Sequence, residues 1–399
     1  MPSISPAALE LPQSAIRKLI PYSDAAKARG IHVYHLNIGQ PDIKTPQGAL
    51  QALQSAQIGV LAYSHSAGEM SYRKKLCEYY HRWGIEVTPD QILVTVGGSE
   101  ALQFAFDVCL GPGDEVIIPE PYYTNYNTFA KLCRTTIKTI PSDIHSGFAL
   151  PPIEAFEEAI TPHTKAIMIC NPNNPTGYLY SKEEIMQLAE IVKKHDLFLF
   201  ADEVYREFCY DGHQHFSIMQ VEGLEKNAVL LDSVSKRYSA CGARVGCMVT
   251  RNEEIYAYAM RLAQARLSPP SFGQVFGEAA IDTPQEYFDA VQLEYITRRN
   301  VVVDRINKIP GCFCPNPKGA FYTVVDLPVD DSDKFCKWLL TDFDLSGETV
   351  MLAPATGFYV DPERGRHQAR ITYCLCVEDL IRAIQCLEIA LKVYPGKTN

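Results

Sequence analysis

The sequence predicts an α/β protein whose mainly parallel central sheet is covered by helices, together with a smaller α+β domain. Two observations predict this class. Short apolar runs rich in Val, Ile and Phe recur through the middle of the chain, and segments with helical periodicity lie between them. Strands that are buried on both faces are continuously apolar, and alternation of strands with helices is typical of parallel sheets.

Six apolar runs are predicted to be strands of this sheet, because they are short and rich in β-branched and aromatic residues. They cover residues 92–96, 116–118, 166–170, 197–201, 229–231 and 247–249. A clear helical pattern spans residues 182–194, where apolar side chains share one face. Ser181 and Glu184 open this helix with a predicted capping box.

Beyond about residue 290 the pattern changes, which indicates a second domain. A strand-like run at residues 321–327 follows a Pro- and Gly-rich turn, then come a helix around residues 335–340 and a terminal helix from Val377. We therefore predict a large domain of residues 46–289. The N-terminal segment is expected to complete the small domain, which then comprises residues 1–45 and 290–399.

Composition and charge exclude several classes of function. The 399 residues carry 37 Lys and Arg against 47 Asp and Glu, with no long run of one sign, which argues against a nucleic-acid partner. No apolar run approaches the roughly 20 residues that span a bilayer, and residues 1–10 lack the features of a secretory signal. Cys312 and Cys314 lack the second pair and histidines of a zinc site. We expect a cytoplasmic protein with no metal site and no membrane partner.

Polar clusters follow directly after four of the predicted strands. The clusters are Gly97-Gly98-Ser99-Glu100, the loop at 171–177, Asp202-Glu203-Val204-Tyr205 and Ser233-Val234-Ser235-Lys236. The carboxyl ends of parallel strands meet at one edge of a sheet, where ligands bind. The clusters are therefore expected to form one site.

Each cluster allows a chemical and a purely structural interpretation. The glycines before Ser99 suit a helix start that binds phosphate, but a strand-to-helix turn also favours glycine. The loop at 171–177 is either a rigid carrier of side-chain amides or only a stiff turn. Asp202 ends an apolar strand, so it either caps a helix or, if buried, needs a cationic partner or hydrogen-bond donors. Lys236 is a Schiff-base nucleophile if it is shielded from water near other cations, and otherwise a surface charge.

The order of these motifs resembles a known family. Asn-Pro-Asn-Asn-Pro-Thr-Gly at 171–177, Asp-Glu-Val-Tyr at 202–205 and Ser-Val-Ser-Lys at 233–236, with Arg244 eight residues later, are similar to the fold-type I, class I aminotransferases that depend on pyridoxal 5'-phosphate (PLP). The aspartate aminotransferase group is the most similar part of that family. The resemblance runs from about Asn37 to Cys374 and implies the fold of the type I PLP-dependent transferases.

The resemblance implies roles for the residues around the cofactor ring. Lys236 is implied to form the Schiff base with PLP and to move the proton between the substrate α-carbon and the cofactor. Asp202 is implied to pair with the pyridinium nitrogen, and Tyr123 to stack on the ring. Asn174 and Tyr205 match the partners of the phenolic oxygen, so the implied catalytic residues are Lys236, Asp202 and Tyr205.

The resemblance also implies a phosphate site and a substrate site. The implied phosphate contacts are Gly98, Ser99, Glu100, Ser233, Ser235 and Arg244. Tyr63 matches a tyrosine that reaches the phosphate of a neighbouring subunit, which implies a homodimer. Arg370 matches the arginine that grips the substrate α-carboxylate, while Gly39 and Asn174 match further substrate contacts.

The sequence does not identify the residue that binds a second, distal carboxylate of the substrate. Ser99 stands where some dicarboxylate-accepting relatives have a lysine, and animal-type enzymes use an arginine of the partner chain. Arg266 lies in the corresponding region, but the sequence does not align it securely.

The predicted reaction moves an amino group from an L-amino acid, with aspartate as the expected donor, to a 2-oxo acid, with 2-oxoglutarate as the expected acceptor. It runs through pyridoxamine phosphate. The alternatives are an aromatic, alanine or branched-chain aminotransferase, or a PLP-dependent β-lyase of cysteine conjugates. A non-catalytic PLP-binding regulator is disfavoured, because the chain is acidic and shows no additional DNA-binding domain.

Overall fold

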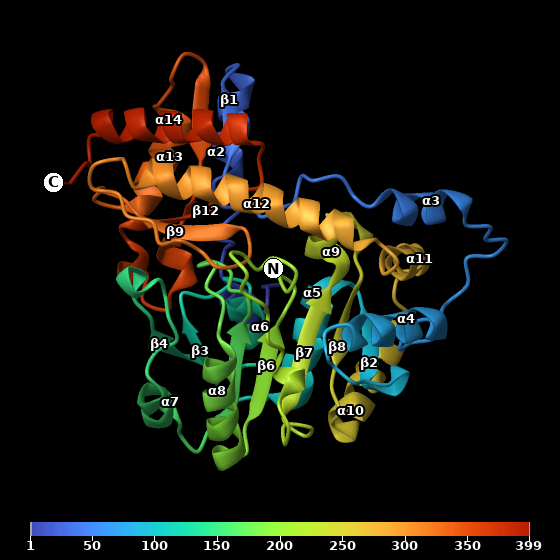
Figure 1. The fold of residues 1–399 in the computed structure, drawn as a ribbon. Helices are drawn as coiled ribbons and strands as arrows, with labels where there is room; N and C mark the ends of the chain where they lie inside the picture. The colour runs from blue at the N-terminus through green and yellow to red at the C-terminus, as the bar shows by residue number, and fades with distance from the viewer. Residues whose placement is uncertain (1, 399) are drawn as a thin grey trace.

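The computed structural model describes residues 2–398 and is built around a seven-stranded sheet (Figure 1). In the order β2-β8-β7-β6-β5-β3-β4, its strands are β2 (Ile92–Thr95), β8 (Gly246–Val249), β7 (Ala228–Ser233), β6 (Phe198–Asp202), β5 (Thr164–Cys170), β3 (Glu115–Glu120) and β4 (Thr136–Pro141). All six predicted strands belong to this sheet. Strand β4 was not predicted, because it lies at an edge and most of its residues are only partly buried or exposed.

The direction of the strands brings the predicted polar clusters to one edge. Strands β4, β3, β5, β6 and β7 are parallel, whereas β8 is antiparallel to both of its neighbours, β7 and β2. Strand β2 therefore runs in the same direction as β7. Since Cys170 of β5 is opposite Asp202 of β6 in the register, the loops after these strands start side by side. The predicted α/β class with a mainly parallel sheet is confirmed.

Helices cover both faces of this sheet. They are α3 (Gln47–Ser55), α4 (Met70–His81), α5 (Gly97–Cys109), α6 (Tyr126–Leu132), α7 (Ile153–Ala159), α8 (Lys182–His195), α9 (Val234–Arg237), α10 (Glu253–Arg266) and α11 (Ser271–Ala280). Alternate residues of a strand enter different cores: Ile167 joins the core that contains Leu188 of α8, while Met168 joins the core that contains Ala105 of α5. Helix α8 confirms the predicted helix, and the capping box of Ser181 and Glu184 is present.

A second group of elements lies over the carboxyl edge of the sheet (Figure 1). It contains the sheets β11-β12-β9 and β1-β10. Its elements are α1 (Pro6–Leu9), α2 (Ile20–Ala28), β1 (His32–His35), β9 (Tyr322–Asp326), α13 (Ser332–Thr341), β10 (Glu348–Met351), β11 (Ala353–Pro354), β12 (Gln368–Thr372) and α14 (Val377–Val393). The predicted elements near 321–327, near 335–340 and after Val377 are β9, α13 and α14.

The long helix α12 (Gln285–Ile306) joins the two groups, and it is continuous through residues 289 and 290. The pairing of β1 with β10 brings the N-terminal segment to the C-terminal elements. The division into domains at these residues stays a prediction.

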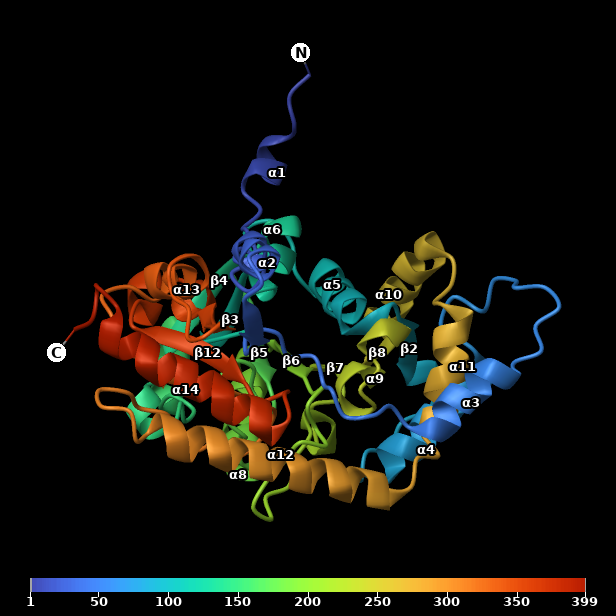
Figure 2. The same ribbon diagram turned by 90° about the horizontal axis from the view of Figure 1, so that it is seen from above.

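Short helices and loops complete the structure. The 3-10 helices are η1 (Pro89–Gln91), η2 (Ile144–Ser146), η3 (Ile218–Gln220), η4 (Cys241–Ala243), η5 (Ala355–Phe358) and η6 (Pro362–Gly365). Figure 2 shows the N-terminal segment with α1 extending away from the body at the top of the view. The segment 56–69, between α3 and α4, forms a loop that projects at the right of the view. Within residues 2–398, no helix is both long enough and apolar enough to cross a bilayer.

Candidate active site

A cavity of about 490 Å³ lies at the carboxyl edge of the seven-stranded sheet, and residues of β9 and β12 also line it. All of the predicted site residues except Glu100 and Tyr63 line this cavity. The predicted residues that the fold brings together there are Gly39, Gly98, Ser99, Tyr123, Asn174, Asp202, Tyr205, Ser233, Ser235, Lys236, Arg244 and Arg370.

Lys236 enters the cavity from the short helix α9, which begins directly after β7. The hydroxyl of Ser233 caps this helix by accepting a hydrogen bond from the backbone N–H of Ser235. The amine Nζ of Lys236 donates to the carbonyl oxygen of Gly39 at 2.9 Å and lies 3.8 Å from Sγ of Cys241. No carboxylate within the described part of the chain forms an ion pair with it. The amine is therefore held in place and remains available to a ligand.

Asp202 is the last residue of β6 and is buried at the floor of the cavity. The hydroxyl of Tyr126 donates to Oδ2 at 2.9 Å, and the backbone N–H of Val204 lies 3.4 Å from Oδ1. Burial raises the pKa of Asp202 to about 6, although the Tyr126 hydroxyl opposes this rise. A turn follows this residue, so the helix-cap interpretation is wrong. None of the described cationic side chains forms an ion pair with Asp202, so its carboxylate is held by hydrogen bonds and can pair with a cationic ligand.

Arg370 of β12 is a buried guanidinium that also lacks an ion-pair partner among the residues described. Its Nη1 donates to Oδ1 of Asn174 at 2.9 Å, and its Nη2 donates to the carbonyl oxygen of Asn37 at 2.5 Å. The Nε atom has no hydrogen-bond partner, although only 1% of the residue is exposed. The aromatic rings of Tyr322 and Phe358 lie against the guanidinium. A bidentate anion such as a carboxylate fits this arginine.

The first turn of α5, two serines and Arg244 form an anion cradle beside Lys236. The hydroxyls of Ser233 and Ser235 lie 2.7 Å apart. Arg244 donates to the carbonyl oxygens of Cys241 at 2.9 Å and Val96 at 3.4 Å, and it forms no ion pair with a described residue. A Cβ at Gly97 would lie 2.4 Å from Nη2 of Arg244, so only glycine lets this guanidinium lie against the helix start. Helix N-termini bind phosphate well.

Tyrosines close the side of the cavity that faces Gly39. The hydroxyl of Tyr205 lies 3.0 Å from the hydroxyl of Tyr322. Burial raises the pKa of both tyrosines above the usual value, so both remain protonated and can donate. A Cβ at Gly39 would lie 1.6 Å from the Tyr322 hydroxyl, which excludes any larger residue at this position. Tyr322 was not predicted as a site residue, because it begins an apolar strand and the sequence does not distinguish it from a core residue.

Val204 lines the cavity as part of the predicted cluster at 202–205, but several other lining residues were missed: Ile16, Arg17, Ile38, Gln40, Leu102, Asn125 and Cys241. Four of these residues, from Ile16 to Gln40, belong to the N-terminal segment. Tertiary packing brings that segment to the cavity, and no local motif marks it.

Glu100, Arg266 and Tyr63 lie outside the lining of the cavity. The carboxylate of Glu100 accepts from the backbone N–H of Val96 at 2.8 Å and from Nη1 of Arg266 at 2.7 Å, so its side chain turns away. The Nη2 atom of Arg266 donates to the carbonyl oxygen of Ser66 at 2.9 Å. Both Nη atoms of Arg266 are thus bonded within its own chain, whereas its buried Nε has no hydrogen-bond partner. Tyr63 is 80% exposed on the segment 56–69.

The residues of this cavity fit PLP. Asp202 offers a buried negative charge for a protonated ring nitrogen, Lys236 offers an amine for a carbonyl carbon, and the cradle with Arg244 suits a phosphate. Three separate features of one cofactor thus find partners that form no ion pair with the residues between 2 and 398. The fold and site define a PLP-dependent transaminase.

Comparison with known proteins gives the same class. Residues 31–385 match the family model described as aminotransferase class I and II. An aspartate aminotransferase of Bacillus subtilis (strain 168) is 33% identical over 369 residues, which are 90% of this chain and 91% of the relative. The chain belongs to the class I and II aminotransferases, and its cofactor is PLP.

Solved structures resemble the whole fold. The aspartate aminotransferase of Thermus thermophilus with maleate has a TM-score of 0.89 and 28% identity, covering 98% of this chain and 100% of the other. An alanine aminotransferase of Pyrococcus furiosus has a TM-score of 0.90 and 29% identity with the same coverage.

Proposed function

We propose that this aminotransferase moves the amino group of L-aspartate to 2-oxoglutarate. The observation that carries the proposal is the placement of Lys236, Asp202 and Arg370 around one cavity, where none of them forms an ion pair with a residue that the structure describes. The choice of aspartate is supported by the similarity to the aspartate aminotransferases of Bacillus subtilis and Thermus thermophilus.

The site residues would hold PLP by its ring and its phosphate. Asp202 would accept from the ring nitrogen, Tyr123 would cover the ring, and Asn174 and Tyr205 would donate to the phenolic oxygen. The phosphate would be held by Gly98, Ser99, the backbone of Glu100, Ser233, Ser235 and Arg244. When bound, the cofactor supplies an electron sink for negative charge at the substrate α-carbon.

The chain itself performs binding, orientation and proton transfer. Arg370 would bind the substrate α-carboxylate, with Asn174 and Gly39 beside it, and this fixes which bond at the α-carbon faces Lys236. The amine Nζ of Lys236 would then take the proton from the α-carbon and return it to the cofactor side. Tyr205 would hold its proton at the hydroxyl, because burial raises its pKa. Lys236, Asp202 and Tyr205 are the proposed catalytic residues.

The proposal includes a homodimer. Tyr63 is 80% exposed, and Val60 and Leu61 on the same segment are also exposed, which is typical of a surface that another chain covers. Tyr63 would reach the phosphate cradle of the partner subunit. Light scattering should give twice the chain mass of 44.6 kDa, whereas a monomer with full activity would contradict this part.

Two further parts of the proposal concern organisation and location. The large domain would span residues 46–289 and the small domain residues 1–45 and 290–399, which is supported by the separate sheets of these regions. A cytoplasmic location is supported by the 13 free cysteines, since reducing compartments keep thiols unpaired.

The direct test mixes the PLP-loaded enzyme with single amino acids and follows cofactor absorbance. Aspartate and glutamate should convert the cofactor to pyridoxamine phosphate, and 2-oxoglutarate should reverse the change. Faster conversion by alanine would favour the second candidate, an alanine aminotransferase, in line with the similarity to the Pyrococcus furiosus protein. Aromatic or branched-chain donors would reassign the substrate, and release of ammonia and pyruvate without an oxo acid would indicate a β-lyase. No absorbance change with any amino acid would contradict the proposal.

A further inference from the structure

The cationic side chains that line the cavity outnumber the roles assigned to them. They are Lys236, Arg244, Arg370 and Arg17, while Asp202 is the only acidic side chain of the lining. In the proposed function Lys236 serves the reaction, Arg244 serves the phosphate and Arg370 serves the α-carboxylate. Arg17 is therefore the one lining cation for which neither the cofactor nor the amino-acid backbone supplies an anion.

The turn that carries Arg17 is fixed against the cavity wall. Residues 15–19 form a turn before α2, and Ala15 and Leu19 are buried. A Cβ at Gly357 would lie 2.3 Å from Cβ of Ala15, so the turn packs closely on this glycine.

The same turn is linked to the site of the α-carboxylate. The side-chain amide of Asn37 donates to the carbonyl oxygen of Ile16 at 3.4 Å, and the carbonyl oxygen of Asn37 accepts from Arg370. Arg17 thus lies on the same wall as the proposed α-carboxylate site.

Arg17 has no ion-pair partner within residues 2–398, whereas its neighbour Lys18 pairs with Asp333 of α13. The charge of Arg17 acts on the hydroxyl of Tyr123: burial raises the pKa of this tyrosine, and Arg370 and Arg17 both oppose the rise. The charge of Arg17 thus acts at the Tyr123 side of the cavity, where Asn125 donates to the same hydroxyl at 2.8 Å.

The surroundings of Arg17 suit a short carbon chain that ends in an anion. Ile16 and Ile38 line the same cavity and offer apolar contact to a methylene group. Arg266 is the alternative candidate for binding a distal carboxylate. It is held by Glu100 and the Ser66 carbonyl and does not line the cavity of its own chain. The serine at position 99 carries no charge.

We propose that Arg17 binds the side-chain carboxylate of a dicarboxylic substrate. This inference rests on the proposed function, because it assumes that Arg370 holds the α-carboxylate. It assigns to the N-terminal turn the choice between dicarboxylic and monocarboxylic amino acids. Arg17 is exposed at the cavity mouth, so its guanidinium is solvated until the second carboxylate arrives.

The test compares Arg17→Gln and Arg17→Lys with the wild type, with Lys18→Gln as the matched control. Lys18→Gln removes an equal charge from the same turn, but that charge is already paired with Asp333. For each PLP-loaded enzyme, the rate of cofactor conversion is measured against the concentration of aspartate and of alanine. Binding of maleate is measured separately by calorimetry, which needs no turnover.

We expect Arg17→Gln to lower kcat/KM for aspartate about 10- to 100-fold and to weaken maleate binding by a similar factor, because a charge-assisted hydrogen bond is lost. The value for alanine should change less than about threefold, Arg17→Lys should recover part of the loss, and Lys18→Gln should leave the aspartate-to-alanine ratio unchanged. Equal losses with both donors would overturn the inference, as would a wild-type preference for aspartate that Arg17→Gln leaves intact. A wild-type enzyme that converts only monocarboxylic amino acids would instead overturn the proposed donor, and the role of Arg17 with it.

Discussion

Two buried aspartates at the ends of adjacent strands behave in opposite ways. Asp232 of β7 accepts from Arg237 and, at 2.9 Å, from the Tyr80 hydroxyl. Burial alone would raise its pKa, but Arg237 and Arg206 hold the pKa of Asp232 below its usual value. No described cation forms an ion pair with Asp202 of β6, and burial raises its pKa to about 6 although the charge of Lys236 opposes the rise. The comparison separates a charge that the fold neutralises from a charge that a ligand must neutralise.

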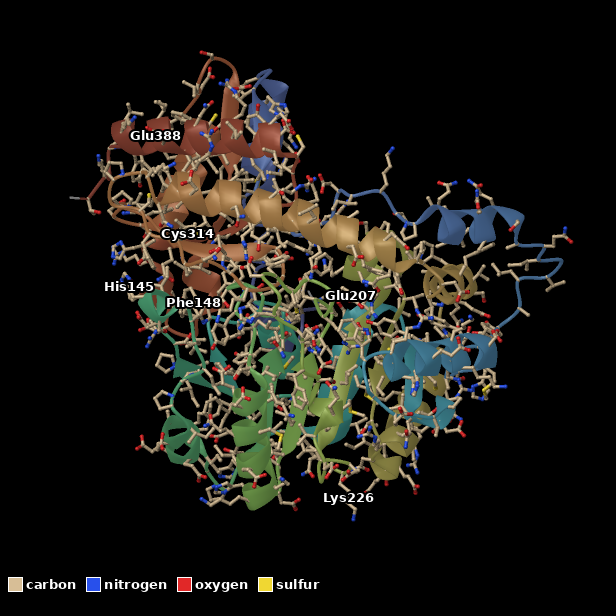
Figure 3. All side chains as sticks on the ribbon, in the orientation of Figure 1. His145, Phe148, Glu207, Lys226, Cys314 and Glu388 are labelled. Carbon is tan, nitrogen blue, oxygen red and sulfur yellow. The ribbon has the colours of Figure 1, made fainter. Side chains whose placement is uncertain are left out.

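The same contrast extends to two regions. The internal ion cluster consists of Glu203, Arg206, Glu207, Asp232 and Arg237, which pair with one another and do not line the cavity. Figure 3 shows Glu207 at the α12 side of the sheet and Lys226 at the opposite end. In the cavity, by contrast, Lys236, Arg244 and Arg370 form no ion pairs with the described residues. Paired charges hold the fold together, and unpaired charges mark the site.

The largest expected effect comes from removing the cavity amine. Lys236→Ala should lower the rate of amino-group transfer by about 1,000- to 10,000-fold, because the proton at the substrate α-carbon loses its acceptor. Borohydride reduction of the loaded variant should leave no cofactor attached, as mass spectrometry can show. Lys226→Ala, which changes an exposed lysine before β7, is the control and should keep full activity. Comparable activity of the two variants would contradict the role of Lys236.

Breaking the internal ion cluster should affect stability first. Asp232→Asn should lower the free energy of unfolding by about 3–5 kcal/mol, because Arg237 and Arg206 remain buried without their carboxylate. Urea unfolding of the variant measures this change. A loss below about 1 kcal/mol would remove the distinction between the two aspartates.

Arg370 sharpens the comparison from the cavity side. Arg370→Ala should lower kcat/KM roughly 30- to 150-fold, mainly by raising KM, because the α-carboxylate loses charge-assisted hydrogen bonds. This factor corresponds to a loss of about 2–3 kcal/mol in binding free energy. The kcat/KM of Arg370→Lys should lie between those of the wild type and Arg370→Ala, since lysine keeps the charge but loses the bidentate fork. Steady-state kinetics with one donor separates these cases, and an unchanged KM for Arg370→Ala would count against the assignment.

The smallest expected effect is a pH-dependent stability difference in the apoenzyme. Because folding raises the pKa of Asp202 from 3.8 to about 6, its ionised form destabilises the folded state, and stability is lost as the pH rises through about 6. Asp202→Asn does not titrate. The apo variant should therefore gain roughly 2–3 kcal/mol relative to the wild type between pH 4 and pH 8, an amount that follows from the shift. Urea unfolding at several pH values would show this trend, and a constant difference would refute it.

Much of the fold could be predicted from sequence, because buried parallel strands are continuously apolar. Strand β4 escaped prediction since its residues at the sheet edge are partly exposed or exposed. The polar clusters were placed correctly at one edge, because direction and order of the strands determine where such loops meet.

The remaining site residues could not be predicted from local patterns. Arg17 and Tyr322 reach the cavity through packing of the N-terminal turn on Gly357 and through the position of β9. Nothing in the sequence shows that Asp232 has buried cationic partners whereas Asp202 lacks them. That difference depends on the placement of Arg206 and Arg237 under β7.

The most direct test of the central claim compares the wild type with Asp202→Asn at pH 8, with and without PLP, by urea unfolding. Without PLP, Asp202→Asn should be the more stable protein, because it removes an unpaired buried carboxylate. With saturating PLP the order should reverse, since only the wild type offers a charge to the ring nitrogen and gains the full stabilisation by ligand. If Asp202→Asn is less stable than the wild type even without PLP, Asp202 is a structural residue, and the claim that its charge is reserved for the cofactor is wrong.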